Sequence, residues 1–326
     1  MTARHEPWFS TRTWADPPWS ATELAAARAG RRISVVLPAL DEEATVAGVL
    51  GAVTPLHPAL VDEVVVVDSG STDRTAARAR AAGARVVTRE EALPGVAVRP
   101  GKGEVLWRAL AATTGDLVVY LDSDLVDVDT RFVTSLLGPL LTVPGVELVK
   151  GFYHRPLRLP RFPSLRSPQP EDDVLATGGG RVTELVARPA LAALRPELAG
   201  IVQPLGGEYA ATRTLLESLP FAGGYGVELG LLLDTHRTRG LDAIAQVDLG
   251  VRKHRHRSLR ALGVTAAEVL DVALRRCAEL GDGPRPLTQF VPVAGQWLPE
   301  VHEVSTEDRP PIRELLATSE RRRPDV

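Results

Sequence analysis

The sequence contains no asparagine, a single cysteine (Cys277) and only three lysines, Lys102, Lys150 and Lys253. One cysteine excludes an intrachain disulfide, and this favours a cytoplasmic protein in a reducing compartment. Arginine carries nearly all the positive charge, which indicates a compositional bias such as that of a GC-rich genome. Where such a composition keeps a lysine, a chemical need for a compact ammonium group is the favoured explanation.

Long apolar runs and an excess of one charge are also missing. No stretch approaches the roughly 18 apolar residues of a membrane span, and residues 1–14 lack the apolar core of a secretory signal, so we expect neither. The 38 basic and 41 acidic residues give a net charge of −3. This balance argues against a strongly basic nucleic-acid-binding protein. The 326 residues, 44% of them hydrophobic, can form one large domain or two smaller ones.

Short apolar runs alternate with helical patterns from residue 33 onward. This alternation predicts an α/β fold with a mainly parallel sheet and crossover helices. Strands are predicted at 33–37, 63–67, 85–88, 117–121, 146–152 and 244–249. Helices are predicted from about residue 43 and at 72–82, 102–112, 130–141, 183–194, 227–239 and 265–280. We expect residues 1–30, with three tryptophans, to pack against the body or a partner subunit. Residues 157–170 should form an exposed loop, and the chain after 281 should be rich in loops.

Polar clusters follow three of these predicted strands, at residues 38–43, 68–73 and 122–124. Ligands of open α/β sheets bind at the carboxyl ends of the strands, so these clusters are candidates for one site. Asp122 and Asp124 could hold Mg²⁺ or Mn²⁺ through their oxygens. The alternative is that they form an acidic turn that caps a helix. A turn with a helix N-cap is likewise the alternative for residues 68–73.

Glycine-rich segments precede three predicted helices. Lys102, in Pro-Gly-Lys-Gly, could reach a phosphate at a helix N-terminus. Arg181 and Thr183 follow three glycines and could donate hydrogen bonds to an anion. Glu228 could hold sugar hydroxyls, or it could simply interact with the helix dipole. An ordinary loop and a solvated arginine are the alternatives for the first two segments.

The run 252–257 is basic, and its two histidines, His254 and His256, alternate with arginines. In an extended segment both would point the same way, and a neutral imidazole could complete a metal site. A solvated basic surface is the usual alternative for such a run.

Residues 35–43, 68–73 and 122–124 together resemble the GT-A nucleotide-sugar glycosyltransferases. Segments 100–103, 180–185, 225–228 and 250–255 narrow the resemblance to the glucosyl-3-phosphoglycerate synthases, a retaining family that also includes mannosyl-3-phosphoglycerate synthases. The resemblance extends over residues 8–274. It implies a GT-A (Rossmann-like) fold with a mixed, mainly parallel sheet and a C-terminal acceptor-binding part. It also implies a division into an arm (1–30), a nucleotide-sugar region (31–156), an acceptor region (157–280) and an extension (281–326).

The activity implied by the resemblance is transfer of glucose from UDP-glucose to the 2-hydroxyl of D-3-phosphoglycerate, with retention at the anomeric carbon. This reaction begins methylglucose lipopolysaccharide synthesis, and the family enzyme is a homodimer that needs a divalent metal ion, Mg²⁺ or Mn²⁺. Same-face attack is the favoured route to retention, with Glu228 and Asp124 as the catalytic residues. By position, the resemblance assigns the nucleotide sugar to Pro38, Ala39, Leu40, Glu42, Ser69, Lys102, Asp122, Ser123, Tyr225 and Glu228, the metal to Asp124 and His254, and the acceptor to Gly180, Arg181, Thr183 and His256.

Two positions depart from the family pattern, because Asp41 and His256 stand where asparagine is usual. The lack of asparagine in the whole chain explains both as drift, although His256 can donate to a phosphate and could alter acceptor binding. Three alternatives stay open. They are a mannosyl-3-phosphoglycerate synthase using GDP-mannose, a non-catalytic nucleotide-sugar-binding protein, and a polyprenyl-phosphate glycosyltransferase.

Overall fold

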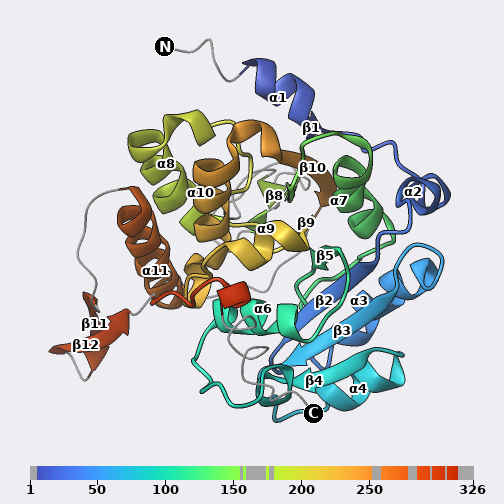
Figure 1. The fold of residues 1–326 in the computed structure, drawn as a ribbon. Helices are drawn as coiled ribbons and strands as arrows, with labels where there is room; N and C mark the ends of the chain where they lie inside the picture. The colour runs from blue at the N-terminus through green and yellow to red at the C-terminus, as the bar shows by residue number, and fades with distance from the viewer. Residues whose placement is uncertain are drawn as a thin grey trace, which may run out of the picture.

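The computed structural model describes residues 6–154, 157–158, 174–175, 180–251, 258–277, 285–293, 296–304 and 307–314. The described residues form an eight-stranded sheet in the order β1-β10-β6-β9-β5-β2-β3-β4, with helices on both faces (Figure 1). Its strands are β1 (Thr13–Trp14), β2 (Ile33–Ala39), β3 (Glu63–Asp68), β4 (Arg85–Thr88), β5 (Leu117–Tyr120), β6 (Leu148–His154), β9 (Tyr209–Thr212) and β10 (Ile244–Val251).

All neighbouring strands of this sheet are parallel except β9, which runs antiparallel to both β5 and β6. The predicted mixed, mainly parallel α/β sheet is therefore confirmed. Two smaller antiparallel pairs lie outside it, namely β7 (Leu157–Arg158) with β8 (Val174–Leu175), and β11 (Arg285–Val293) with β12 (Gln296–Val304).

In the first half of the chain most strands are followed by a helix. The α-helices of the described residues are α1 (Glu6–Arg12), α2 (Ala21–Ala27), α3 (Val46–Val53), α4 (Thr75–Ala81), α5 (Arg89–Ala92), α6 (Lys102–Ala111), α7 (Arg131–Thr142), α8 (Arg188–Leu194), α9 (Arg213–Ser218), α10 (Val227–Arg239) and α11 (Leu259–Cys277). Short turns of other helix types are η1 (Thr54–Leu56), η2 (Thr183–Ala187), η3 (Pro196–Leu198), η4 (Gly224–Gly226) and η5 (Leu241–Ala243).

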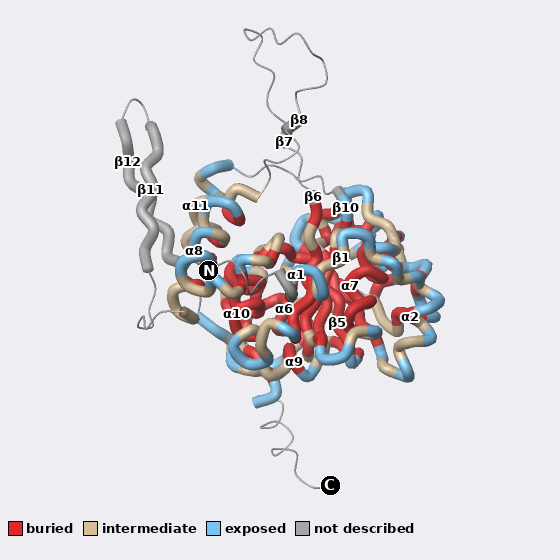
Figure 2. Tube along the Cα trace, turned by 90° about the horizontal axis from the view of Figure 1, so that it is seen from above, coloured by how far each residue is buried: buried red, intermediate tan, exposed pale blue. Residues whose placement is uncertain are grey.

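Successive residues of the strands enter two different hydrophobic cores. On β2, Val36 packs into the core that contains residues of α6, α9 and α10, whereas Val35 and Leu37 pack into the core with α2, α3 and α7. This alternation is the two-residue period of an extended strand. Because both faces are covered, the central strands are largely buried and most of their residues are apolar (Figure 2).

The chain reverses its direction of progress across the sheet next to β2. From β2 it adds β3 and then β4 on one side, and it returns to place β5 on the other side. Such a reversal opens a crevice between the loops that leave the two strands, at their carboxyl ends. The polar clusters after β2 and β5 flank this crevice.

Two expectations differ from the structure. The short strand β9 was not predicted, because Tyr-Ala-Ala-Thr contains no run of branched apolar residues. The expectation of a loop-rich chain after residue 281 is wrong for residues 285–293 and 296–304, which form the β11–β12 hairpin. Prolines in both of its strands obscure the strand pattern.

The N-terminal arm packs against the body, as expected. The indole of Trp8 is buried and donates to the carbonyls of Leu241 and Ile244, at 3.0 and 3.1 Å. Strand β1 adds an edge to β10. The predicted division at residue 157 stays a prediction. Strands β9 and β10 belong to the same sheet as β2 to β6. A boundary at residue 157 would therefore separate two functional regions and not two structural domains.

Residues 307–314 are anchored on α6. Arg309 donates to both carboxylate oxygens of Glu104, at 2.7 and 3.0 Å, and Trp107 donates to the carbonyl of Pro310. A bridge between Phe221 and Arg309 adds a backbone link. These contacts therefore stabilise the position of α6, the helix that begins at Lys102. No helix in the described part of the chain has the length and apolar character needed to cross a membrane.

Candidate functional site

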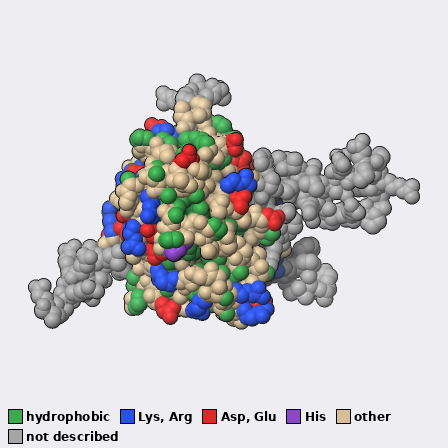
Figure 3. Space-filling model, turned by 90° about the vertical axis from the view of Figure 1, so that its right-hand side faces the viewer, with side chains coloured by type: hydrophobic (Ala, Val, Ile, Leu, Met, Phe, Trp, Pro, Cys, Tyr) green, Lys and Arg blue, Asp and Glu red, His purple; other side chains and the backbone are tan. Residues whose placement is uncertain are grey.

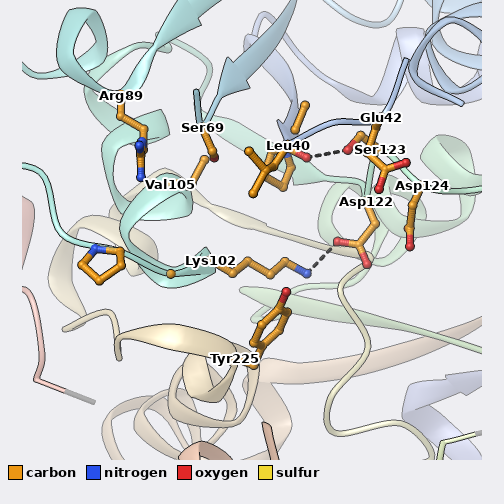
Figure 4. A pocket seen from close by; sticks show the side chains of 14 residues that line it. Leu40, Glu42, Ser69, Arg89, Lys102, Val105, Asp122, Ser123, Asp124 and Tyr225 are labelled. Atoms are coloured by element: carbon orange, nitrogen blue, oxygen red, sulfur yellow. Dashed lines mark hydrogen bonds and ion pairs between the residues drawn. The ribbon is translucent and has the colours of Figure 1, made fainter. Parts of the chain in front are cut away.

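A cavity of about 420 Å³ lies at the carboxyl ends of β2, β3 and β5 (Figure 4). Its volume falls in the range of small-ligand pockets. The lining residues are Pro38, Ala39, Leu40, Glu42, Ser69, Arg89, Pro100, Gly101, Lys102, Val105, Asp122, Ser123, Asp124 and Tyr225. Ten of the predicted site residues are thus brought to one cavity from five separate segments.

Hydrogen bonds between neighbouring loops shape one wall of this cavity. Asp41 adopts a left-handed conformation (φ 54°), and its carboxylate accepts the backbone N–H of Thr72 at 2.7 Å. The Asp41 N–H donates in turn to the hydroxyl of Ser71 at 3.0 Å. Asparagine and aspartate are the side chains that best tolerate this backbone conformation. Aspartate therefore meets the structural demand at this position.

The ends of β2 and β5 are joined by Ser123. Its hydroxyl donates to the carbonyl of Pro38 at 2.7 Å. This bond fixes the turn that carries Asp122 and Asp124 against the loop that carries Leu40. Leu40 is 54% exposed and projects into the cavity opening, so it offers an apolar surface to a ligand.

Lys102 links two carboxylates at the floor of the cavity. Its Nζ lies 2.6 Å from Oδ1 of Asp122 and 2.7 Å from Oε1 of Glu228. Burial works to lower the pKa of Lys102, but attraction to the two carboxylates outweighs it and raises the pKa above its ordinary value. The lysine therefore keeps its positive charge between the two carboxyl groups.

Close glycine contacts allow α6 to approach the start of α10. A Cβ on Gly103 would lie 1.9 Å from the carbonyl oxygen of Ala222, and a Cβ on Gly101 would lie 2.8 Å from the backbone nitrogen of Gly224. Side chains at these positions would separate the two segments. The glycines on both sides of Lys102 are thus required for its contact with Glu228.

Glu228 lies behind Lys102, in the first turn of α10. Its side chain is only 4% exposed, and it meets the cavity through Lys102. Tyr225, three residues earlier, points its hydroxyl toward Lys102 and Asp122 (Figure 4). The backbone N–H of Tyr225 donates to Glu268 of α11 at 2.8 Å, which anchors this turn.

Arg89 is the main lining residue that the sequence analysis missed. It follows β4, so the rule of strand carboxyl ends would have indicated it, had β4 been included with the other three strands. It projects toward the cavity beside Ser69 and Val105, at the end remote from Asp124 (Figure 4). Its Nε is buried and has no hydrogen-bond partner within the described part of the chain.

Other predicted site residues are not placed at this cavity. Gly180 (φ 85°), Arg181 and Thr183 lead into η2 and are not among the lining residues. His254 and His256 lie outside the described residues. Among the residues that are described, no group of three or more histidine, cysteine, aspartate or glutamate side chains gathers as a metal site.

The charged groups of the surface do not form one extended patch on the face shown in Figure 3. Basic and acidic side chains are interspersed there. This agrees with the small net charge of −3.

Comparison with known proteins shows that the fold is that of a glycosyltransferase. The profile of Glycosyl transferase family 2 matches residues 34–164. These residues include the turns after β2, β3 and β5 that form the cavity.

Similar proteins with named activities indicate which kind of glycosyltransferase family the chain belongs to. The glucosyl-3-phosphoglycerate synthase of Mycolicibacterium smegmatis is 56% identical over 308 residues, which are 94% of this chain and 98% of that protein. A solved structure of the Mycobacterium tuberculosis glucosyl-3-phosphoglycerate synthase with Mg²⁺ and UDP has a TM-score of 0.83 and 55% identity, and the match covers 93% of this chain and 99% of that chain. Another, with Mn²⁺, UDP-glucose and phosphoglyceric acid, has a TM-score of 0.82 at 55% identity and covers 93% and 98%. The chain belongs to the glucosyl-3-phosphoglycerate synthase family.

Proposed function

We propose that the protein transfers glucose from UDP-glucose to the 2-hydroxyl of D-3-phosphoglycerate with retention, to give glucosyl-3-phosphoglycerate. The observation that carries this proposal is the single cavity lined by ten residues that the family pattern assigns to the nucleotide sugar and the metal. Near-complete alignment with relatives of this activity supports it.

The cavity has two chemically different ends. Asp122, Asp124 and Tyr225 lie at one end, and Arg89 and Ser69 lie at the other (Figure 4). The sugar and the diphosphate belong at the acidic end, where Lys102 supplies positive charge. The uridine then extends along Leu40 toward Arg89, whose guanidinium can donate to carbonyl oxygens of the base.

Asp124, with His254, would hold the divalent metal ion. The Asp124 side chain lines the cavity and offers carboxylate oxygens, which suit Mg²⁺ and Mn²⁺. When bound, such an ion supplies positive charge that stabilises the departing UDP. Asp122, which is held by Lys102, would contact the ribose or sugar side of the ligand.

Side chains of the protein hold the glucose and the acceptor in place for the reaction. Glu228 lies behind Lys102 and outside the cavity lining, so it would reach the glucose hydroxyls beside the Lys102 ammonium, and its orientation is fixed by the 2.7 Å contact with Lys102. Gly180, Arg181 and Thr183, with His256, bind the phosphate or carboxylate of the acceptor. The bond from the anomeric carbon to the UDP oxygen breaks, and a bond to the acceptor's 2-oxygen forms on the same face. The proton of the 2-hydroxyl passes to the departing phosphate oxygen.

A product assay tests the proposal. UDP-glucose, GDP-glucose and GDP-mannose are each combined with D-3-phosphoglycerate and a divalent metal, and the product is identified by mass and by anomeric NMR. We expect an α-glucosyl product from UDP-glucose. A mannosyl product would replace the donor assignment. Metal-dependent UDP binding with no product from any donor would indicate another acceptor or a non-catalytic role.

Two further properties belong to the same proposal. The family resemblance supports a homodimer, which light scattering of the purified protein would test. The single cysteine supports a reducing, cytoplasmic location. Sedimentation with membranes would instead support the polyprenyl-phosphate alternative.

A further inference from the structure

Lys150, the second of the three lysines, lies on β6 beneath the cavity and has no role in the reaction described above. The residue is 2% exposed. Its Nζ donates to the carbonyl of Gly206 at 2.5 Å and lies 5.1 Å from the centre of the Tyr209 ring. A lysine so completely buried needs an explanation, because removing an ammonium group from water is energetically costly.

The segment that Lys150 holds also contacts the ionic groups at the cavity floor. A Cβ on Gly207 would lie 2.5 Å from Oδ2 of Asp122 and 2.6 Å from Nζ of Lys102. The backbone of Gly207 therefore packs directly against this pair. On the other side, a Cβ on Gly206 would lie 2.8 Å from the carbonyl oxygen of Gly151, next to Lys150. Residues 206–207 are thus held between Lys150 below and the Lys102–Asp122 pair above.

Three of the four charged groups that act on Lys150 belong to the same cluster, and the fourth is Glu208. Burial lowers the pKa of Lys150 to about 8, while Glu228, Glu208 and Asp122 attract its charge and Lys102 repels it. For stability alone, an apolar side chain of similar length would serve as well or better. Retention of an ammonium here, in a chain with only three lysines, indicates a use in the site above it.

We propose that Lys150 is a positioning residue for glucosyl transfer, which fixes the backbone of residues 206–207 and, through it, the Lys102–Asp122–Glu228 cluster. The inference rests on the proposed function, because it assigns this cluster to the sugar. Lys150 touches no substrate. Its effect passes through the Gly206 carbonyl, whose direction it sets, and through the close contact of Gly207 with Asp122.

The test is Lys150→Met, which keeps an unbranched side chain of similar length and removes the ammonium. Because a displacement of about 1 Å at a reacting centre can cost about 100-fold in rate, we expect kcat to fall about 10- to 100-fold. UDP affinity should stay within about twofold of the wild type, since the lost interaction concerns the sugar end of the cavity. Lys150→Gln, which keeps a shorter, uncharged donor, should lie between the two proteins.

Gln246 provides a matched control on the neighbouring strand. It lies directly opposite Lys150 in the β10–β6 pairing and is equally buried. Its side chain bonds to Val202, Gly200 and Thr13, away from the ionic cluster. Gln246→Met should therefore lower the melting temperature without changing kcat.

Hydrogen exchange of the peptide that spans residues 203–210 gives a readout independent of activity. We expect faster exchange there in Lys150→Met than in Gln246→Met. The proposal is overturned if Lys150→Met keeps its kcat, if UDP affinity falls in parallel with kcat, or if exchange at 203–210 is equal in the two variants. A wild-type protein that makes no glucosyl product refutes the proposed function instead, and the exchange measurement then decides the role of Lys150. If Lys150→Met does not fold, Lys150→Gln carries the same comparison.

Discussion

Replacement of Gly103 by alanine should destabilise the protein, although the same change stabilises most helices. Gly103 is the second residue of α6. In a helix interior, alanine is favoured over glycine by about 0.5–1 kcal/mol. At Gly103, however, the new Cβ would lie 1.9 Å from the carbonyl oxygen of Ala222 and 3.3 Å from Cβ of Val227. The obstacle is backbone, which cannot rotate away as a flexible side chain can.

The size of the effect follows from the movement required. The contact with Ala222 must lengthen from 1.9 Å to beyond 3.0 Å, so α6 or residues 222–227 must shift. Overpacking of this kind costs about 1–3 kcal/mol, which exceeds the gain in helix propensity, and the net loss should be about 1–2 kcal/mol. Because Lys102 is the adjacent residue, its contact with Glu228 should lengthen and kcat should fall.

Gly51 is the matched control. It lies exposed in α3, and nothing stands within 4 Å of a Cβ placed there. Gly51→Ala should raise the free energy of unfolding by about 0.5–1 kcal/mol and leave kcat unchanged. Both variants are measured by urea unfolding and by the product assay. If Gly103→Ala is as stable and as active as Gly51→Ala, the close seating of α6 on residues 222–224 is refuted.

Four further outcomes are expected. Glu228→Gln should lower kcat and leave UDP affinity nearly intact, and an unchanged turnover would remove this residue from the mechanism. His254→Ala should weaken metal-dependent UDP binding, whereas equal affinity for UDP at saturating metal would count against its role as a ligand. Arg89→Met should weaken UDP binding about tenfold or more, as expected for loss of a hydrogen bond from a charged group, with little change in kcat; an unchanged Kd for UDP would contradict its place in the site. Lys150 should give the wild type a rise in stability between about pH 8 and 10.5 that Lys150→Met lacks. In that range the unfolded chain still holds the lysine proton and the folded chain has released it, so unfolding takes up a proton. A rise in pH disfavours proton uptake and therefore raises the free energy of unfolding. Parallel pH profiles for the two proteins would refute the lowered pKa.

The fold was predictable where each strand is a run of apolar residues with a helix behind it. Strands β2 to β6 and β10 follow this pattern, because parallel strands buried on both faces need apolar residues throughout. Strand β9 could not be found this way. Its four residues are specified by β5 and β6 on either side, which are contacts at a distance along the chain.

The site was predictable as far as general rules of sheet geometry apply. The rule that ligands bind at strand carboxyl ends led to the turns after β2, β3 and β5, which do line one cavity. It could not show that Lys102 joins Asp122 to Glu228, because that contact depends on how closely α6 approaches α10. The glycines at 101, 103 and 224 were visible in the sequence, but the backbone atoms that they accommodate were not.

The scarcity of lysine was the most specific compositional signal in the chain, and it applies equally to Lys102 and Lys150. Both lie in one buried ionic cluster, one above and one below the backbone of Gly207. The Lys102 ammonium meets two carboxylates that converge from different directions, and the Lys150 ammonium meets the Gly206 carbonyl beside the Tyr209 ring. A planar guanidinium matches such compact sites poorly. If arginine has replaced lysine wherever the two residues are equivalent, the lysines that are left mark positions where arginine cannot take the place of lysine. On this argument the ammonium groups of Lys102 and Lys150 were retained for the geometry of the site, since arginine carries the positive charge at nearly all other basic positions of the chain.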